Sequence, residues 1–218
     1  MKQFIILTFL ICSFQVEAQL SFNFAWKNEK IELLKYYPLE EKDSIQFSDL
    51  KCYLSNIELK GKGIKDCKLA SSVYLVDAQD VTSYILDNSI DTRNFNSISF
   101  TFGLDSIINT SGDLEGALDP VLGMYWAWNT GYIHHKIVGH SSLVPTPSQL
   151  FDFHIGGYRK PNATYFNLDL PLIGSTIELD LYQLFNENIN LNLSHQLVVP
   201  GKLAFELATV LKSSIRIK

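Results

Sequence analysis

The sequence predicts a mainly β fold, an antiparallel β-sandwich-like single domain with a short C-terminal helix. Two observations carry this prediction: apolar and polar residues alternate over several short segments, and turn-forming residues separate those segments. The 218 residues, of which 46% are hydrophobic and 19% charged, suffice for one domain with a substantial core. Because no repeat, linker or charge block divides the chain, we expect one domain over residues 19–218.

Four segments show the alternation that is typical of half-buried strands. Side chains of a strand point alternately to two faces, so one face of each segment is expected in the core and the other in water. Clusters of glycine, proline and asparagine between the segments mark turns. Several such strands at short spacing favour a sandwich or a barrel. The segments are residues 98–104, 166–170, 177–181 and 189–193.

The last part of the chain has helical periodicity instead. A Pro-Gly pair is followed at helical spacing by Leu203, Leu207, Val210 and Leu211. This spacing places the four side chains on one face of a helix. We expect an amphipathic helix that closes one end of the sandwich.

Residues 1–18 have the pattern of an export signal. Lys2 supplies a positive charge, residues 4–14 are almost continuously apolar, and Val16-Glu17-Ala18 is a small-residue cleavage pattern. The apolar run is too short for a resident transmembrane helix, and no later segment is long and apolar enough to be one. We expect cleavage after Ala18 and a mature protein that is periplasmic, at the cell surface or secreted.

The exported chain would keep two cysteines, Cys52 and Cys67. In an oxidising compartment an isolated pair predicts a disulfide, and Gly61 and Gly63 between them can turn the chain back. A loop of this size would contribute roughly 3 kcal/mol in the chain-entropy model. A pair of thiolate metal ligands is the alternative interpretation.

Charge and missing motifs narrow the function classes. The formal net charge of −5 and the lack of any basic run argue against a nucleic-acid partner. The sequence has no Gly-x-Ser-x-Gly, no His-Glu-x-x-His, no complete phosphate-binding glycine loop and no Cys-x-x-Cys-His. Serine hydrolases, zincin proteases, dinucleotide enzymes and c-type cytochromes are therefore not indicated, and we expect a protein without catalytic activity.

The stretch from residue 116 to residue 154 holds the candidate chemistry. Two of the three tryptophans, Trp126 and Trp128, and four of the five histidines lie in it. On a strand, Trp126 and Trp128 would point to one face. Neutral imidazole suits copper and zinc, and copper binds more tightly in the general order of divalent ions. The alternative is that the tryptophans are core anchors and the histidines are surface or hydrogen-bonded core residues.

The same alternation separates the histidines by face. His135 would share its face with Ile133 and Ile137, which indicates the core, whereas His134 would lie on the opposite, more polar face. His154 would share its face with Asp152. A neighbouring carboxylate such as Asp152 can orient a metal-ligating imidazole through its other nitrogen.

Several motifs together resemble a known family. The run ALDPVLGMYWAWNTGY, which starts at Ala117, is followed by FHIGGY at residues 153–158. CYLSNIEL, YLVDA and FGLDS precede them at residues 52–59, 74–78 and 102–106. In this order the motifs resemble the MbnP-like family of exported copper-binding proteins, and the resemblance spans residues 20–218.

The resemblance implies a largely β, exported protein that acquires or handles copper. In some members a tryptophan is oxidised to kynurenine and ligates copper together with two histidines, and a dihaem peroxidase-like partner performs the oxidation. Carried over to this chain, Trp126 and Trp128 match the family's tryptophan positions, and His154 matches its His-Gly motif. We therefore expect His154, His134, Trp126 and Trp128 at a copper site, with His154 as the first ligand.

This chain also departs from the family pattern. Neither tryptophan has a histidine two residues later, and residues 21–28 lack the histidine that many members carry in the first strand. The second imidazole is therefore open, and His134 is our choice because its neighbours on that face are polar. The alternative function is an interaction module whose tryptophan-rich loop binds a protein or sugar without metal; a copper oxidoreductase is a third hypothesis.

Overall fold

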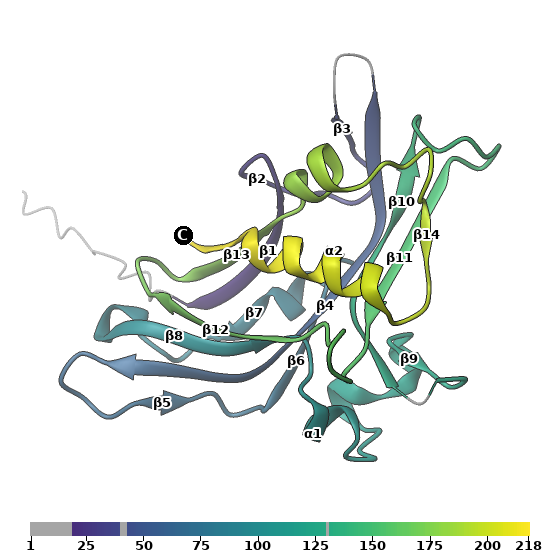
Figure 1. Ribbon diagram of the computed structural model, residues 1–218. Helices are drawn as coiled ribbons and strands as arrows, with labels where there is room; N and C mark the ends of the chain where they lie inside the picture. Colours follow the sequence, from purple (N-terminus) through teal and green to yellow (C-terminus); the bar gives the residue numbers. More distant parts are fainter. Residues whose placement is uncertain (1–18, 40–42, 130) are drawn as a thin grey trace, which may run out of the picture.

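The chain folds into two β-sheets that share one apolar core, and helix α2 (Lys202–Ser213) lies across one side of this core (Figure 1). The computed structural model describes residues 19–39, 43–129 and 131–218. The expected export signal at residues 1–18 lies outside the described residues. No helix in the described ranges is long and apolar enough to cross a membrane.

The smaller sheet has five strands in the order β15-β13-β1-β2, with β7 also pairing with β1. β1 and β13 run parallel, with Phe22 opposite Ile177. Parallel neighbours cannot be joined by a hairpin, and the chain builds most of the larger sheet between them. The strands are β1 (Leu20–Trp26), β2 (Glu29–Lys30), β7 (Ile85–Asp87), β13 (Thr176–Asp180) and β15 (Ile215–Ile217).

The larger sheet is organised around the 18-residue strand β4 (Ser44–Gly61). The first half of β4 pairs with β10 and the second half with β8, in the order β12-β8-β4-β10-β11-β14. β3, β5 and β6 also pair with β4, and β9 pairs with β10. The other strands are β3 (Tyr36–Pro38), β5 (Cys67–Lys68), β6 (Val73–Asp77), β8 (Phe95–Phe102), β9 (Tyr125–Trp126), β10 (Gly131–Ser141), β11 (Leu150–Gly156), β12 (Phe166–Pro171) and β14 (Gln196–Leu197).

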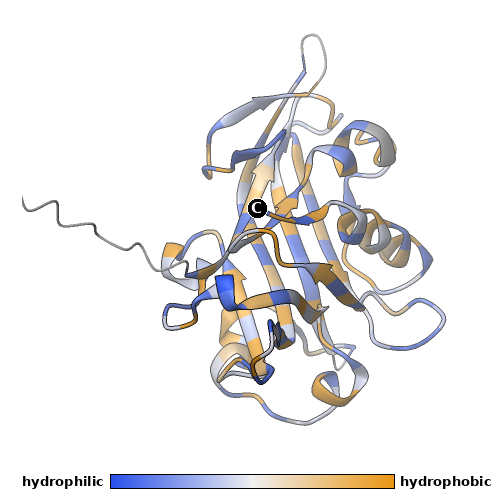
Figure 2. Cartoon of the chain, turned by 90° about the vertical axis from the view of Figure 1, so that its left-hand side faces the viewer, coloured by the Kyte–Doolittle hydropathy of each residue, from blue (hydrophilic) through white to orange (hydrophobic). Residues whose placement is uncertain are grey.

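The mainly β, sandwich-like prediction is confirmed, with one change in strand direction. Two pairings are parallel, β1 with β13 and β11 with β14, so the sheets are mixed where the sequence predicted antiparallel strands. Hydrophobic and hydrophilic residues alternate along the strands of the larger sheet (Figure 2). The predicted strands at 98–104, 166–170 and 177–181 correspond to β8, β12 and β13.

The predicted strand at 189–193 is wrong. Residues Leu184–Asn188 form a short π-helix, and the chain then turns around Asn190. The side chain of Asn190 accepts a hydrogen bond from the backbone of Asn192 at 3.1 Å. Asparagine side chains compete in this way with strand ladders, so the polar residues of this stretch favour a turn over a strand.

The C-terminal helix is confirmed. Ala204, Leu207, Ala208 and Leu211 are buried on one face of α2, whereas Leu203 remains 40% exposed. The chain then adds β15 to the edge of the smaller sheet, which the sequence analysis did not predict. The other short helices are η1 (Val81–Tyr84), η2 (Thr92–Asn94), α1 (Ser106–Asn109), η3 (Gly116–Leu118), η4 (Pro120–Leu122) and η5 (Leu184–Asn188).

The predicted disulfide between Cys52 and Cys67 is wrong, because both cysteines are free. Cys67 lies on β5 opposite Leu59 of β4, seven residues along that strand from Cys52. At about 3.3 Å per residue this places the two cysteines roughly 23 Å apart, far beyond the separation of about 7 Å that a disulfide can bridge. Burial raises the pKa of the Cys52 thiol above its ordinary range, so it is a core residue rather than a thiolate ligand.

Candidate metal centre

His154 lies on the outer face of the larger sheet, in strand β11. Phe151 and Phe153 are fully buried, whereas Asp152 and His154 are only partly buried. The alternation predicted for this segment is therefore confirmed. The apolar side of β11 faces the core, and its polar side carries His154, with Lys136 of β10 directly opposite in the antiparallel ladder.

Asp152 is the nearest charged neighbour of His154. Its Oδ1 is 2.9 Å from Nε2 of His154, and the two side chains are 28% and 20% exposed. Oδ1 lies off the direction of the ring N–H and receives no hydrogen bond. The carboxylate therefore acts on the imidazole through its charge. Nδ1 of His154 has no hydrogen-bond partner among the described residues.

Two ion pairs neutralise the rest of this face. Lys136 is 2.9 Å from Asp49, and Lys51 is 2.9 Å from Asp77, with all four side chains less than a fifth exposed. Asp152 has no lysine partner in the described part of the chain. Asp152 therefore places next to His154 a negative charge that no lysine compensates, which favours a cation over an anion.

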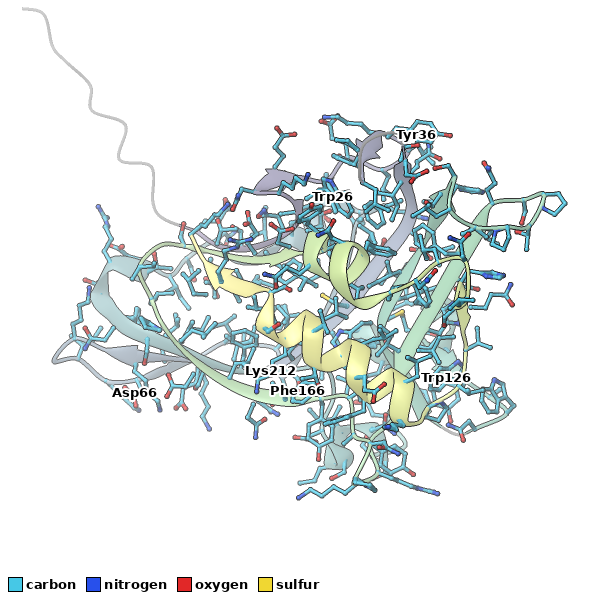
Figure 3. All side chains as sticks on the ribbon, turned by 45° about the horizontal axis from the view of Figure 1, so that its top comes forward. Trp26, Tyr36, Asp66, Trp126, Phe166 and Lys212 are labelled. Atoms are coloured by element: carbon cyan, nitrogen blue, oxygen red, sulfur yellow. The ribbon has the colours of Figure 1, made fainter. Side chains whose placement is uncertain are left out.

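Trp126 packs on the same face as His154. A Cβ added to Gly156 would lie 2.9 Å from Cη2 and from Cζ3 of the Trp126 indole, so the ring covers this glycine. Gly156 follows His154 at the next position of the same face, about 7 Å along the strand. Trp126 is 5% exposed and belongs to a second apolar cluster, to which β4, β6, β9 and β10 contribute together with the segment between β8 and β9. In Figure 3, Trp126 lies at the end of the molecule opposite to Asp66 of the β4–β5 hairpin.

Trp128 stands beside Trp126 but faces solvent. The ring centroids are 5.7 Å apart, tilted by 45°, and Trp128 is 63% exposed. The two tryptophans therefore differ in environment, although the sequence placed them on one face. Trp126 ends β9, and Trp128 lies in the turn that follows, so the strand alternation that the prediction assumed stops between them.

A β-bulge changes the predicted positions of the neighbouring histidines. The ladder between β10 and β11 shifts register between Ile133 and His135, which makes His134 the extra residue. An extra residue of this kind interrupts the alternation of side chains. Both His134 and His135 are consequently buried, with 0% and 1% of their surface exposed. The core position of His135 was predicted; the burial of His134 was not.

The environment of His134 leaves neither ring nitrogen free. Nδ1 is 2.9 Å from the hydroxyl of Thr164, and Nε2 is 3.4 Å from Oδ1 of Asn109. Burial lowers the pKa of His134 to about 4, so the ring is neutral at physiological pH. Gly103 and Tyr165 also lie next to the His134 ring, so little space remains around it.

His135 is held in the main core. Its ring stacks on Phe102 with centroids 4.0 Å apart, and its Nε2 is 3.3 Å from the carbonyl oxygen of Thr164. Burial, reinforced by the neighbouring His134, lowers the pKa of His135 to about 3. Nδ1 of His135 is buried without a partner among the described residues. This histidine therefore belongs to the core, as the alternation predicted.

The structure thus brings together part of the expected site. His154, Trp126 and Trp128 gather at one end of β11, with Asp152 beside the imidazole. His134 is tied to Asn109 and Thr164. In the described ranges no group of three His, Cys, Asp or Glu side chains converges as a metal site would require. Gly156 was not predicted as part of the site, although the paired glycines after His154 signalled a close approach.

Fold and site define this chain as a mixed β-sandwich protein with a partly exposed histidine two residues before a glycine that a buried tryptophan covers. A family model described as MbnP matches residues 15–201. The chain therefore belongs to the MbnP family, as the motifs predicted.

One solved structure supports the fold. The chain is similar to MbnP from Methylosinus trichosporium, with 15% identical residues, a TM-score of 0.54, and coverage of 85% of this chain and 82% of that chain. At this level of identity the similarity shows the fold alone. No match was found among curated proteins.

Proposed function

We propose that this protein is exported and binds copper as part of copper acquisition or handling, without catalysis. The observation that supports this most is the placement of the Trp126 indole over Gly156, next to His154 on the same face. The family resemblance implies copper ligation by two histidines and an oxidised tryptophan, and here Trp126 covers the position next to His154 on one strand face.

The side chains at this site supply one of the ligands that a copper ion would need. His154 offers an unpartnered Nδ1 beside the negative charge of Asp152, and neutral imidazole is a good ligand for copper. A second donor must come from elsewhere, because both ring nitrogens of His134 face other groups. Oxidation of Trp126 would supply a donor that the unmodified indole lacks. A dihaem peroxidase-like partner is the class of enzyme for this step, and the exposed Trp128 would be part of its contact surface.

A titration of Cu(I) against a competing chelator tests the proposal. We expect His154→Ala to weaken Cu(I) binding by at least a hundredfold. His140→Ala is the matched control, because His140 is also a partly buried histidine of this face but lies opposite Leu150, four residues along β11 from His154. Equal affinities of the His154→Ala variant and the wild type would remove His154 from the site.

Mass spectrometry of the protein from its own host, grown with copper, tests the tryptophan. We expect an oxidative mass change on Trp126, and its loss in Trp126→Phe but not in Trp128→Phe. A change confined to Trp128 would assign the modification to the exposed ring.

A second candidate is an interaction module without metal. The exposure of Trp128, at 63%, favours it, because exposed aromatic side chains are typical of contact surfaces. A protein that binds no copper in either form, modified or not, would support this candidate.

A further inference from the structure

A pocket of about 380 Å³ lies between the end of α1 and the start of β10. This volume is in the range of small-molecule sites, roughly 300–1,000 Å³. Its lining does not include His154, Trp126 or Trp128, so it is separate from the proposed copper site. Three tyrosines supply its aromatic walls: Tyr125, Tyr132 and Tyr158.

The floor of the pocket contains a buried amide that lacks a partner. Asn109 is 5% exposed, and its Nδ2 has no hydrogen-bond partner in the described ranges. Its Oδ1 accepts a hydrogen bond from the backbone N–H of Tyr132 at 3.2 Å. This bond fixes the orientation of the amide and directs Nδ2 away from that N–H. A buried donor without a partner is unfavourable, so a ligand that accepts from it gains affinity.

Gly131 keeps the space next to this donor open. A Cβ at Gly131 would lie 3.3 Å from Nδ2 of Asn109 and 3.7 Å from Cε1 of Tyr158. Any larger residue would therefore fill the gap between the amide and the tyrosine ring. Asn109 and Tyr158 both line the pocket, so this gap borders it.

The rim adds groups of both hydrogen-bonding types. The Arg159 guanidinium lies 5.3 Å from the centre of the Tyr158 ring, and its Nε donates to the Tyr158 hydroxyl at 3.3 Å. Its other N–H groups remain available as donors, while the exposed carboxylate of Asp113 lines the same pocket as an acceptor. The pocket therefore offers ring faces together with donors and acceptors.

We propose that this pocket binds a pyranose sugar. The C–H face of a pyranose packs on a tyrosine ring, and its hydroxyls both donate and accept. One hydroxyl would accept from Asn109 Nδ2, and others would reach Arg159 and Asp113. A flat anionic ligand would use the arginine and the rings but would be repelled by Asp113.

Saturation-transfer NMR and fluorescence titration with methyl glucoside, methyl galactoside and methyl mannoside test the proposal, with benzoate as the flat anionic comparison. We expect at least one glycoside to bind more tightly than benzoate. Tyr158→Ala should weaken that binding by about tenfold. Tyr36→Ala, which removes a tyrosine that is 63% exposed on β3, should leave it unchanged.

Asn109→Asp supplies a second test that preserves the acceptor for the backbone of Tyr132. A sugar hydroxyl can rotate and donate to the new carboxylate, so glycoside binding should stay within about tenfold of the wild type. Benzoate, which only accepts, should lose whatever binding it has. Tighter binding of benzoate than of every glycoside, equal effects of Tyr158→Ala and Tyr36→Ala, or no glycoside binding would each overturn the proposal.

Discussion

The buried histidine pair predicts a specific loss of stability in acid. The pKa values of His134 and His135 fall from 6.5 in the unfolded chain to about 4 and about 3 in the folded protein. Below pH 6.5 the unfolded chain binds protons that the folded protein does not, so stability falls as the pH is lowered through this range. Between pH 7 and pH 4.5, each histidine should reduce the free energy of unfolding by about 2.5 kcal/mol, at 1.36 kcal/mol per pKa unit.

Urea unfolding followed by tryptophan fluorescence at pH 7 and pH 4.5 measures this loss. Carboxylates contribute to acid destabilisation in every variant, so the informative quantity is the difference between wild type and variant. His135→Phe keeps an aromatic ring beside Phe102 but cannot titrate, and it should lose about 2.5 kcal/mol less than the wild type between the two pH values. His134→Gln should behave in the same way.

Ile137→Val serves as the control, because Ile137 is a buried neighbour on the same strand. It should cost about 1 kcal/mol at both pH values and leave the pH dependence unchanged. If His135→Phe and His134→Gln instead show the same pH dependence as the wild type, the reasoning from burial is refuted.

Two further predictions concern the cysteines and the helix. In the folded chain from residue 19 onward, a thiol reagent should label the partly exposed Cys67 and not the buried Cys52. After unfolding, both thiols should be labelled. A reductant should leave the melting temperature unchanged. Mass spectrometry counts the labelled thiols and checks this. A lower melting temperature in reductant would show instead that Cys52 and Cys67 form a disulfide. Leu211→Ala on the buried face of α2 should cost about 2–5 kcal/mol in urea unfolding, whereas Leu203→Ala, at a 40% exposed position, should cost far less; equal costs would contradict the packing of α2.

Much of the fold could be predicted because the relevant patterns are local. Alternation identified β8, β12 and β13, and helical spacing identified the buried face of α2. The same rule separated Phe153 from His154 on β11. It failed at residues 189–193, where asparagine side chains compete with the strand ladder.

The candidate site was predictable only where its residues lie in regular strands. His154 and Asp152 share the face that alternation assigned to them. His134 does not follow the pattern, because a bulge is set by the pairing of β10 with β11, and no residue of β10 by itself specifies it. The contact of Trp126 with Gly156 likewise joins two strands.

By itself, the sequence determined the mainly β class, the C-terminal helix and, through its motifs, the MbnP family. These depend on periodicity and on residue order, which are properties of neighbouring positions along the chain. Only the tertiary structure decided the distance between Cys52 and Cys67, the burial of His134 and the orphaned amide of Asn109. The first two depend on strand register and the third on the packing of α1 against β10, and all three are fixed by contacts between segments that are apart in sequence.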